Sequence, residues 1–469
     1  MRGIISTKKL RRKEMMRVFA DYGMDKDKLA DTRINYADCF DLVLSKTERI
    51  SRYDSNINRN VCVIGSSGSR KTSGYIFTNV LQCCTPNPYT PSLVINDGNG
   101  EILSQTGKAL EEADYIIKVL NLCDPSKSLH FNPFRYFQNK NIEEEICMVS
   151  AAIIKHNSNA RTHEFKKIAM LNILIGLCVD ESDECSLYSV WEKIQMIRKN
   201  AMVNSTELWE EIMVILHKSE WNGLRNFCIK NWYELWDYMN DEKGLKFNIL
   251  FREIELELEF FSVLEIKELL SKDEFDLEKI GQEKTAVFVV YPRVSDKLSC
   301  IANLFYTFLI EQIKAMNLTS PLDFPIRFLL DDFFDTGCVI NLEDLILLGT
   351  TFKFNVDVSI TMQNIMQMQV LYGNWTRKLL SHCDTILYFG TGRCSIETAE
   401  FISMNCVYVD SNYGFIPRIA VREVQKLKRG KVLVHINGRD MCISKPFYYE
   451  KHKNYKLTAS YNPERTYKW

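Results

Sequence analysis

The stretch that most limits the possible folds is "VCVIGSSGSRKTSGYIFTNVLQ", residues 61–82. It begins with the apolar residues of a buried strand, continues into a Gly/Ser turn, and ends with apolar residues at helical spacing. The turn, GSSGSRKT, fits the phosphate-binding pattern G-x-x-x-x-G-K-[ST] except that Arg70 replaces the second glycine. This strand–turn–helix predicts a nucleotide-binding α/β core. The alternative is an ordinary Gly/Ser turn followed by a coincidental Lys-Thr pair.

In such a loop, backbone N–H groups and the positive end of the following helix bind phosphate oxygens. Lys71 would reach the β- and γ-phosphates, and the hydroxyl of Thr72 would bind Mg²⁺. If the backbone at Arg70 is helical, the arginine adds a second cation; if its φ angle is positive, the backbone strain costs ~1–2 kcal/mol. The predicted nucleotide-binding residues are Gly65, Ser66, Ser67, Gly68, Ser69, Arg70, Lys71, Thr72 and Ser73.

Two later strand patterns end in polar groups that suit phosphate chemistry. "IRFLLDD" ends in Asp331, placed to orient Mg²⁺, and in Asp332, where a glutamate usually polarises the attacking water. Asp332 is one methylene shorter than glutamate, and a misplacement of that size can lower the rate ~10²-fold. "VDVSITMQ" ends in Gln363, an amide that would sense the γ-phosphate. The alternatives are a strand-end turn for the acid pair and a helix-capping role for the glutamine.

Strand and helix patterns alternate from about 55 to 135 and again from about 280, which is typical of parallel β-α-β units. Between them, apolar residues recur at helical spacing, with 250–271 as one continuous helical pattern. A hairpin is expected near the C-terminus, with Asn437-Gly438 as its turn. The sequence thus predicts three parts: a basic segment 1–55, a nucleotide-binding domain of 56–138 and 280–469, and an all-α domain of 139–279.

Composition narrows the class of protein. The chain has 469 residues, 46% of them hydrophobic, with 59 basic and 60 acidic residues, which disfavours a nucleic-acid-coating protein but leaves room for a local basic channel. The 15 cysteines form no CxxC pair, so a zinc site is disfavoured and reduced thiols are expected. There is no signal peptide and no apolar run of the ~18 residues needed to span a membrane. We therefore expect a cytoplasmic protein.

Several stretches, in order, resemble the TraG-like coupling proteins of conjugation and type IV secretion, especially the form found on mobile elements of Gram-positive bacteria. The resemblance extends from about residue 60 onward, and the helical middle is similar in placement more than in letters. The C-terminal "KPFYYEKHKNYK" resembles the last strand and tail of that family. The other matching stretches are "VIGSSGSRKT", "VINDGNGEILSQTGKALEEADYIIKVLNL", "FNPF", "IRFLLDDFFDTGCVINLEDL", "SITMQNIMQMQVLYG", "SHCDTILYFGTG" and "ETAEFIS".

The resemblance implies a RecA-like P-loop ATPase core with an all-α domain, assembled as a homo-hexameric ring that uses ATP and Mg²⁺. Such proteins recruit a relaxase-bound single DNA strand and feed it to the type IV secretion channel. By matched position, Lys71 and Thr72 belong to Walker A, Asp331 is the Walker B acid, Asp332 the general base and Gln363 the polar sensor. The membrane helices typical of the family are missing. The chain is therefore expected either to dock on a membrane partner at the inner face of the cell membrane or to start late.

The sequence departs from the family pattern near the expected site. Besides Arg70 and Asp332, Asn99 stands where a lysine is common, and Phe352 and Phe354 stand where arginines are usual. These changes favour an alternative: a nucleotide-binding, hydrolysis-impaired docking module. A further alternative is another hexameric DNA-pumping ATPase.

Two other features bear on these alternatives. An arginine finger lent to a neighbouring subunit would mark a motor, and the candidates are Arg293, Arg377 and Arg393. The aromatic residues of 221–239 stack on DNA bases in one interpretation and are ordinary core residues in the other.

Overall fold

The computed structural model describes most of the chain after residue 40. The described residues are 41–51, 54, 56–85, 90–138, 141–155, 163–182, 184–204, 206–218, 224–239, 244–292, 296–319, 322–392, 394–405, 407–410, 414–417 and 419–469. The basic segment 1–55, predicted as a separate part, therefore lies mostly outside the described residues.

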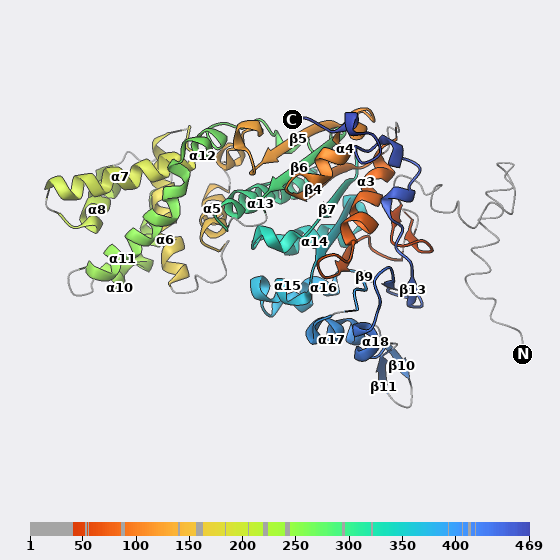
Figure 1. Ribbon diagram of the computed structural model, residues 1–469. Coiled ribbons are helices and arrows are strands. Elements are labelled where there is room, and N and C mark those ends of the chain that lie inside the picture. Colours follow the sequence, from red (N-terminus) through yellow and green to blue (C-terminus); the bar gives the residue numbers. More distant parts are fainter. Residues whose placement is uncertain are drawn as a thin grey trace, which may run out of the picture.

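A nine-stranded sheet forms the centre of the described structure (Figure 1). In spatial order its strands are β13 (Cys442–Ser444), β12 (Val432–Ile436), β9 (Thr385–Phe389), β3 (Val61–Ile64), β8 (Val356–Met362), β7 (Ile326–Leu330), β4 (Ser92–Gly98), β6 (Thr285–Tyr291) and β5 (Ile116–Asn121). From β9 to β5 all neighbours are parallel, whereas β12 is antiparallel to both β9 and β13. The predicted parallel α/β core and the C-terminal hairpin are both confirmed.

Helices cover both faces of the sheet, so its strands are buried on two sides. Along β3, Val61 and Val63 pack into one core with the helices α3 (Phe77–Cys83) and α4 (Glu101–Glu111), while Cys62 and Ile64 face the other core. This alternation follows from the two-residue period of a strand. The second core includes α13 (Asp296–Thr319), α14 (Leu342–Thr350) and α15 (Ile365–Tyr372), with α16 (Trp375–Ser381) beside it.

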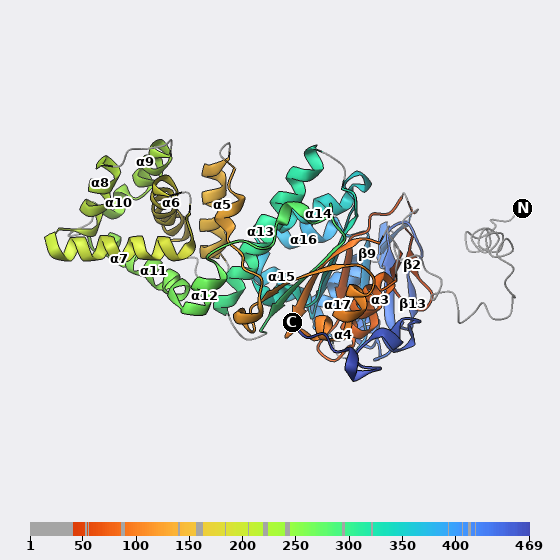
Figure 2. The same ribbon diagram turned by 90° about the horizontal axis from the view of Figure 1, so that it is seen from above.

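A region made of helices alone stands to one side of the sheet (Figures 1 and 2). It consists of α5 (Ile142–Lys155), α6 (Glu164–Glu181), α7 (Leu187–Asn204), α8 (Leu208–Lys218), α9 (Arg225–Glu234), α10 (Trp236–Met239), α11 (Leu245–Leu258) and α12 (Leu264–Leu269). The continuous helical pattern expected over 250–271 is wrong in one respect. A 3₁₀ turn at Glu259–Ser262 and the extended Val263 separate α11 from α12.

The aromatic residues around α9 and α10 divide between core and surface. Trp232 and Tyr238 are buried, whereas Tyr233 and Trp236 are 68% and 59% exposed. No helix among the described residues combines the length and the apolar character needed to cross a bilayer.

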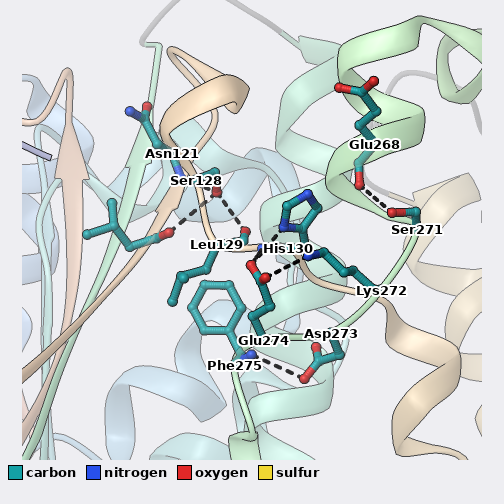
Figure 3. Close-up of polar contacts among 11 residues, drawn as sticks. Asn121, Ser128, Leu129, His130, Glu268, Ser271, Lys272, Asp273, Glu274 and Phe275 are labelled. Atoms are coloured by element: carbon teal, nitrogen blue, oxygen red, sulfur yellow. Dashed lines mark hydrogen bonds and ion pairs between the residues drawn. The ribbon is translucent and has the colours of Figure 1, made fainter.

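The chain crosses between the sheet and the helical region twice, and the two crossings are joined by polar contacts (Figure 3). The backbone N–H of His130 donates to Oε2 of Glu274 over 3.0 Å, and the N–H of Glu274 donates to the carbonyl of His130 over 3.0 Å. Hydrogen bonds from Lys272 and from the His130 ring lower the pKa of Glu274 to about 2. The junction is thus a paired connection and not a single linker.

After β13 the chain runs over α3 and α4 without forming another strand. The amide of Asn454 donates to the carbonyl of Leu81 over 2.9 Å, and the N–H of Tyr467 donates to the carbonyl of Ser104 over 3.0 Å. The expectation of a last strand in 445–456 is wrong, because β13 ends at Ser444 and short 3₁₀ turns follow. Two small hairpins were not expected from the sequence: β1 (Leu42–Val43) with β2 (Arg49–Ile50), and β10 (Val407–Asp410) with β11 (Gly414–Pro417).

Candidate nucleotide-binding site

The predicted site residues meet at the carboxyl ends of three neighbouring strands. The loop Gly65–Ser73 follows β3, the pair Asp331 and Asp332 follows β7, and Gln363 follows β8, which lies between the other two. In open parallel sheets, ligands bind outside the carboxyl ends of the strands. The topology therefore brings together side chains that are far apart in the sequence.

Asp331 is the centre of a hydrogen-bonded group. The hydroxyl of Thr72 donates to Oδ2 of Asp331 over 2.8 Å, and the hydroxyl of Thr361 donates to Oδ1 over 2.8 Å. Burial, and then the nearby charge of Asp332, raise the pKa of Asp331 above its usual range. A buried carboxylate whose charge is disfavoured, next to a hydroxyl oxygen, suits a hard divalent cation such as Mg²⁺.

Lys71 is paired with the other acid. Its Nζ lies 2.7 Å from Oδ1 of Asp332, and both side chains are almost fully buried. The N–H of Asp332 donates to Oγ1 of Thr361 over 2.9 Å, and its backbone is left-handed, with φ 42°. The lysine predicted to hold phosphates thus contacts the acid predicted to act as general base. Phosphate binding would require Lys71 to exchange this carboxylate for phosphate oxygens.

The backbone of the acid pair is held by residues that the sequence analysis missed. The amide of Asn96 donates to the carbonyl of Asp331 over 2.8 Å, and its own oxygen accepts from the hydroxyl of Tyr306 over 3.0 Å. The hydroxyl of Tyr291 donates to the carbonyl of Asp332 over 3.3 Å. The available signal was positional, because each residue follows an apolar run: Asn96 comes after residues 93–95 (LVI) in β4, and Tyr291 is the last residue of β6 after 286–290 (AVFVV).

Asp97 supports the same edge of the sheet. Its carboxylate accepts from the N–H groups of Ile102 and Leu103 over 3.0 and 2.7 Å, at the start of α4. Burial raises the pKa of Asp97 to about 7. Asn99, which departs from the family pattern, has a φ of 62°. Asparagine tolerates left-handed backbone better than most residues, so this replacement suits the turn.

Arg70 has the strained backbone considered above, with φ 64°. A non-glycine residue there costs ~1–2 kcal/mol. Its guanidinium forms an ion pair with Glu450 and lies 4.1 Å from the centre of the Tyr448 ring. Both partners belong to the segment that follows β13, so the arginine joins the loop to the C-terminal part of the chain.

Gln363 does not cap the next helix, so that alternative is wrong. Asn364 is the N-cap of α15, and its side chain accepts from the N–H of Gln367 over 3.2 Å. The N–H of Gln363 donates to Oε1 of Gln367 over 2.7 Å, and its role as a sensor stays a prediction.

The arginine-finger hypothesis also stays a prediction. Of the candidates, Arg377 is exposed on α16, and Arg293 and Arg393 lie outside the described residues.

Residues 20–408 match the family "Type IV secretory system Conjugative DNA transfer". Among solved structures, the fold is similar to the bacterial conjugative coupling protein TrwBdeltaN70 in its unbound form, with a TM-score of 0.58 and 14% identity over 89% of this chain and 90% of that chain. TrwB in complex with ADP and Mg²⁺ gives a TM-score of 0.56 and 14% identity over 91% and 92%. TrwB with a non-hydrolysable ATP analogue gives 0.54 and 14% over the same shares. No curated protein matches the sequence.

At this identity the structural similarity shows the fold alone. The fold class predicted from the sequence, a RecA-like P-loop core with an inserted all-α part, is confirmed.

Proposed function

The chain belongs to the Type IV secretory system Conjugative DNA transfer family, and from this premise we propose that it is a P-loop ATPase that drives single-stranded DNA towards a secretion channel. One observation carries the proposal. Thr72 and Lys71 of the loop contact Asp331 and Asp332 respectively, so the residues that would bind phosphate and Mg²⁺ lie side by side. TrwB, which shares the fold, is known with ADP and Mg²⁺ and with an ATP analogue.

In this proposal each residue has a separate task. The N–H groups of the loop and Lys71 bind the phosphates of ATP, and Thr72 with Asp331 would hold Mg²⁺, which would supply positive charge to the phosphates. Once Lys71 turns to the phosphates, the carboxylate of Asp332 is free to orient the attacking water. The amide of Gln363 contacts the γ-phosphate and signals its presence to β8.

We propose the partners by analogy with the family. We infer that residues 56–138 and 280–469 act as the nucleotide-binding domain and 139–279 as the all-α domain of a homo-hexamer. The substrate is single-stranded DNA with its relaxase, and the ring works at the inner face of the membrane with channel components and a membrane partner. The near-zero net charge is compatible with this, because six subunits multiply the few cations that each contributes to a channel.

The test is steady-state ATP hydrolysis by the purified full chain, with and without single-stranded DNA, beside Lys71→Ala. We expect hydrolysis that DNA stimulates and that Lys71→Ala abolishes, because the variant lacks the cation for the phosphates. The oligomeric state is measured in the same samples, because a monomer would lack the neighbouring subunit that hydrolysis requires in a ring. ATP affinity that is the same in wild type and Lys71→Ala would contradict the phosphate-binding role of the loop.

A second candidate function is a hydrolysis-impaired docking module of the same family. It is favoured by the buried pair of Lys71 with Asp332 and by the strained Arg70. Tight ATP binding by an assembled ring, with no hydrolysis in the presence or absence of DNA, would establish this candidate in place of the motor.

A further inference from the structure

A basic loop lies next to the phosphate-binding loop, although some 360 residues separate them in the sequence. It spans 426–431 (KLKRGK), between α18 (Val421–Gln425) and β12, and its four cationic residues are exposed. The N–H of Gly390 donates to the carbonyl of Lys431 over 3.0 Å, and the N–H of Gly392 donates to the carbonyl of Leu427 over 2.8 Å. The basic loop is therefore fixed to residues 390–392.

Residues 390–392 are in turn fixed to the phosphate-binding loop. The hydroxyl of Ser66 donates to Oγ1 of Thr391 over 3.0 Å. Only glycine fits at 390, because a Cβ there would lie 2.6 Å from the carbonyl oxygen of Leu427 and 2.7 Å from that of Lys428. Residues 390–392 thus contact the basic loop through their backbone and the phosphate-binding loop through the Ser66–Thr391 hydroxyl pair. Together these contacts fix the position of the basic loop relative to the phosphate-binding loop.

Within the basic loop, Arg429 reaches the phosphate-binding loop itself. A Cβ on Gly68 would lie 3.5 Å from Nη2 of Arg429, and the backbone of Gly68 is left-handed, with φ 73°. The glycine thus allows the turn and leaves the guanidinium close to the backbone. Arg429 is exposed, and none of the described residues forms an ion pair with it.

The two arginines beside the P-loop differ in their contacts. Arg70 belongs to the loop, but Glu450 and Tyr448 already occupy its guanidinium. Arg429 comes from elsewhere and is left without a carboxylate among the described residues. A guanidinium that has no carboxylate partner among the described residues and lies beside Gly68 of the phosphate-binding loop makes a site for an anion, and arginine suits phosphate because it donates two parallel hydrogen bonds.

We propose that Arg429 binds the phosphates of the nucleoside di- or triphosphate held by the P-loop of its own chain. The proposal rests on the proposed function, since it requires a nucleotide at that loop. Arg429 then supplies the second cation that Arg70 does not direct to the site, and the Ser66–Thr391 contact sets its position. It is a binding residue contributed in cis, distinct from any arginine lent by a neighbouring subunit.

The experiment measures the affinity of the full chain for a fluorescent, non-hydrolysable ATP analogue with Mg²⁺. Arg429→Gln is expected to weaken binding about 10- to 100-fold, the loss typical of a hydrogen bond between charged groups. Arg429→Lys should lose less, because it keeps the charge and loses only the paired geometry. Lys426→Ala is the matched control from the same loop and should stay within about two-fold of wild type. Melting without nucleotide should be unchanged, because Arg429 is exposed.

The outcomes separate this inference from the proposed function. If wild type binds the analogue, Lys71→Ala does not, and Arg429→Gln binds like wild type, the inference fails and the proposed function stands. If wild type does not bind the analogue, both fail. If Arg429→Gln keeps its nucleotide affinity but binds single-stranded DNA more weakly, the guanidinium serves DNA phosphates and the inference is overturned.

Discussion

Strands β7 and β8 carry one buried ionic cluster at their amino ends and another at their carboxyl ends, and the two clusters differ in their balance of charge. At the amino ends, Arg327 donates from Nε and Nη2 to Oδ2 of Asp357 over 3.2 and 3.1 Å, and Arg59 lies 2.8 Å from the other oxygen of the same carboxylate. Arg327 has no exposed surface. At the carboxyl ends of the same strands, Lys71 pairs with Asp332, and the neighbouring Asp331 accepts hydrogen bonds from the hydroxyl groups of Thr72 and Thr361.

The comparison distinguishes a cluster that serves stability, at the amino ends, from a candidate binding site, at the carboxyl ends. At the amino ends, two guanidinium groups surround one carboxylate, so the cluster holds three strands together and leaves its acid no open side. At the carboxyl ends, the one lysine pairs with Asp332 and leaves Asp331 without a cation in contact among the described residues, and the pKa of Asp331 is raised by burial and by the charge of Asp332. The excess negative charge makes a place for a cation. Burial is common to both ends, so it is the balance of charge that distinguishes them.

The largest expected effect is on stability, from Asp357→Asn. The variant leaves Arg327 buried and without its charged partner, and breaking a buried pair in this way costs about 3–5 kcal/mol of unfolding free energy. Chemical denaturation of wild type and variant, without nucleotide, measures the difference. A loss below about 1 kcal/mol would mean that water or another group replaces Asp357, and the amino end would not be the structural one.

The matched change at the other end, Asp331→Asn, should act on chemistry. Loss of the carboxylate that we propose to hold Mg²⁺ should lower ATP hydrolysis about 100-fold or more, as removal of one group that stabilises charge in a transition state typically does. Steady-state hydrolysis across a Mg²⁺ titration measures the effect. Hydrolysis that still rises with Mg²⁺ as in wild type would show that Asp331 is not the metal residue.

The difference in unfolding free energy between wild type and Asp331→Asn should depend on pH. Because the pKa of Asp331 is raised in the folded state, its ionisation opposes folding above that pKa. As pH falls from 8 towards the unfolded value of about 4, wild type should therefore gain unfolding free energy relative to Asp331→Asn. Denaturation at several pH values measures this difference. A difference that does not change with pH would contradict the raised pKa.

Part of this site is readable from the sequence because its signals are local. The strand–turn–helix at 61–82 and the apolar strands that end in Asp331 and Gln363 each lie within one element, and parallel strands necessarily place their carboxyl ends together. The central sheet was predictable for the same reason. The sequence therefore places the three strand ends at one edge of the sheet. It does not predict which of their side chains contact one another.

The contacts that decide the chemistry are long-range. Lys71 and Asp332 are 261 positions apart, and Arg70 and Glu450 are 380 positions apart. No local pattern of polarity predicts such partners. The sequence likewise does not predict the sign of φ at Arg70, because the loop pattern is compatible with a helical and with a left-handed backbone there. Nothing in the sequence was a reason to select Arg429, because a short basic loop is usually solvated. Only the proximity of the Arg429 guanidinium to Gly68 in the folded chain indicates a role in binding.

A smaller effect is expected from Asp332→Glu. The longer side chain moves the carboxylate by about one methylene, which should raise hydrolysis, by at most ~10²-fold, if the short acid limits the rate. Single-turnover hydrolysis compares it with wild type, and Asp332→Asn, which keeps the length and loses the base, is the control. A rate equal to or below that of wild type would mean that the left-handed backbone at Asp332 already places the shorter acid correctly.

The smallest effect concerns the strain at Arg70, and it is isolated by comparing two variants with each other. Arg70→Gly and Arg70→Ala both remove the ion pair with Glu450 and the contact with Tyr448, so these losses cancel in the comparison. Only glycine adopts a φ of 64° without strain. Part of that advantage is offset, because glycine is more flexible when unfolded. Arg70→Gly should then exceed Arg70→Ala in unfolding free energy by about 1 kcal/mol. If both variants unfold at the same denaturant concentration, the loop in solution relaxes to a backbone that any residue accepts, and the arginine was never strained.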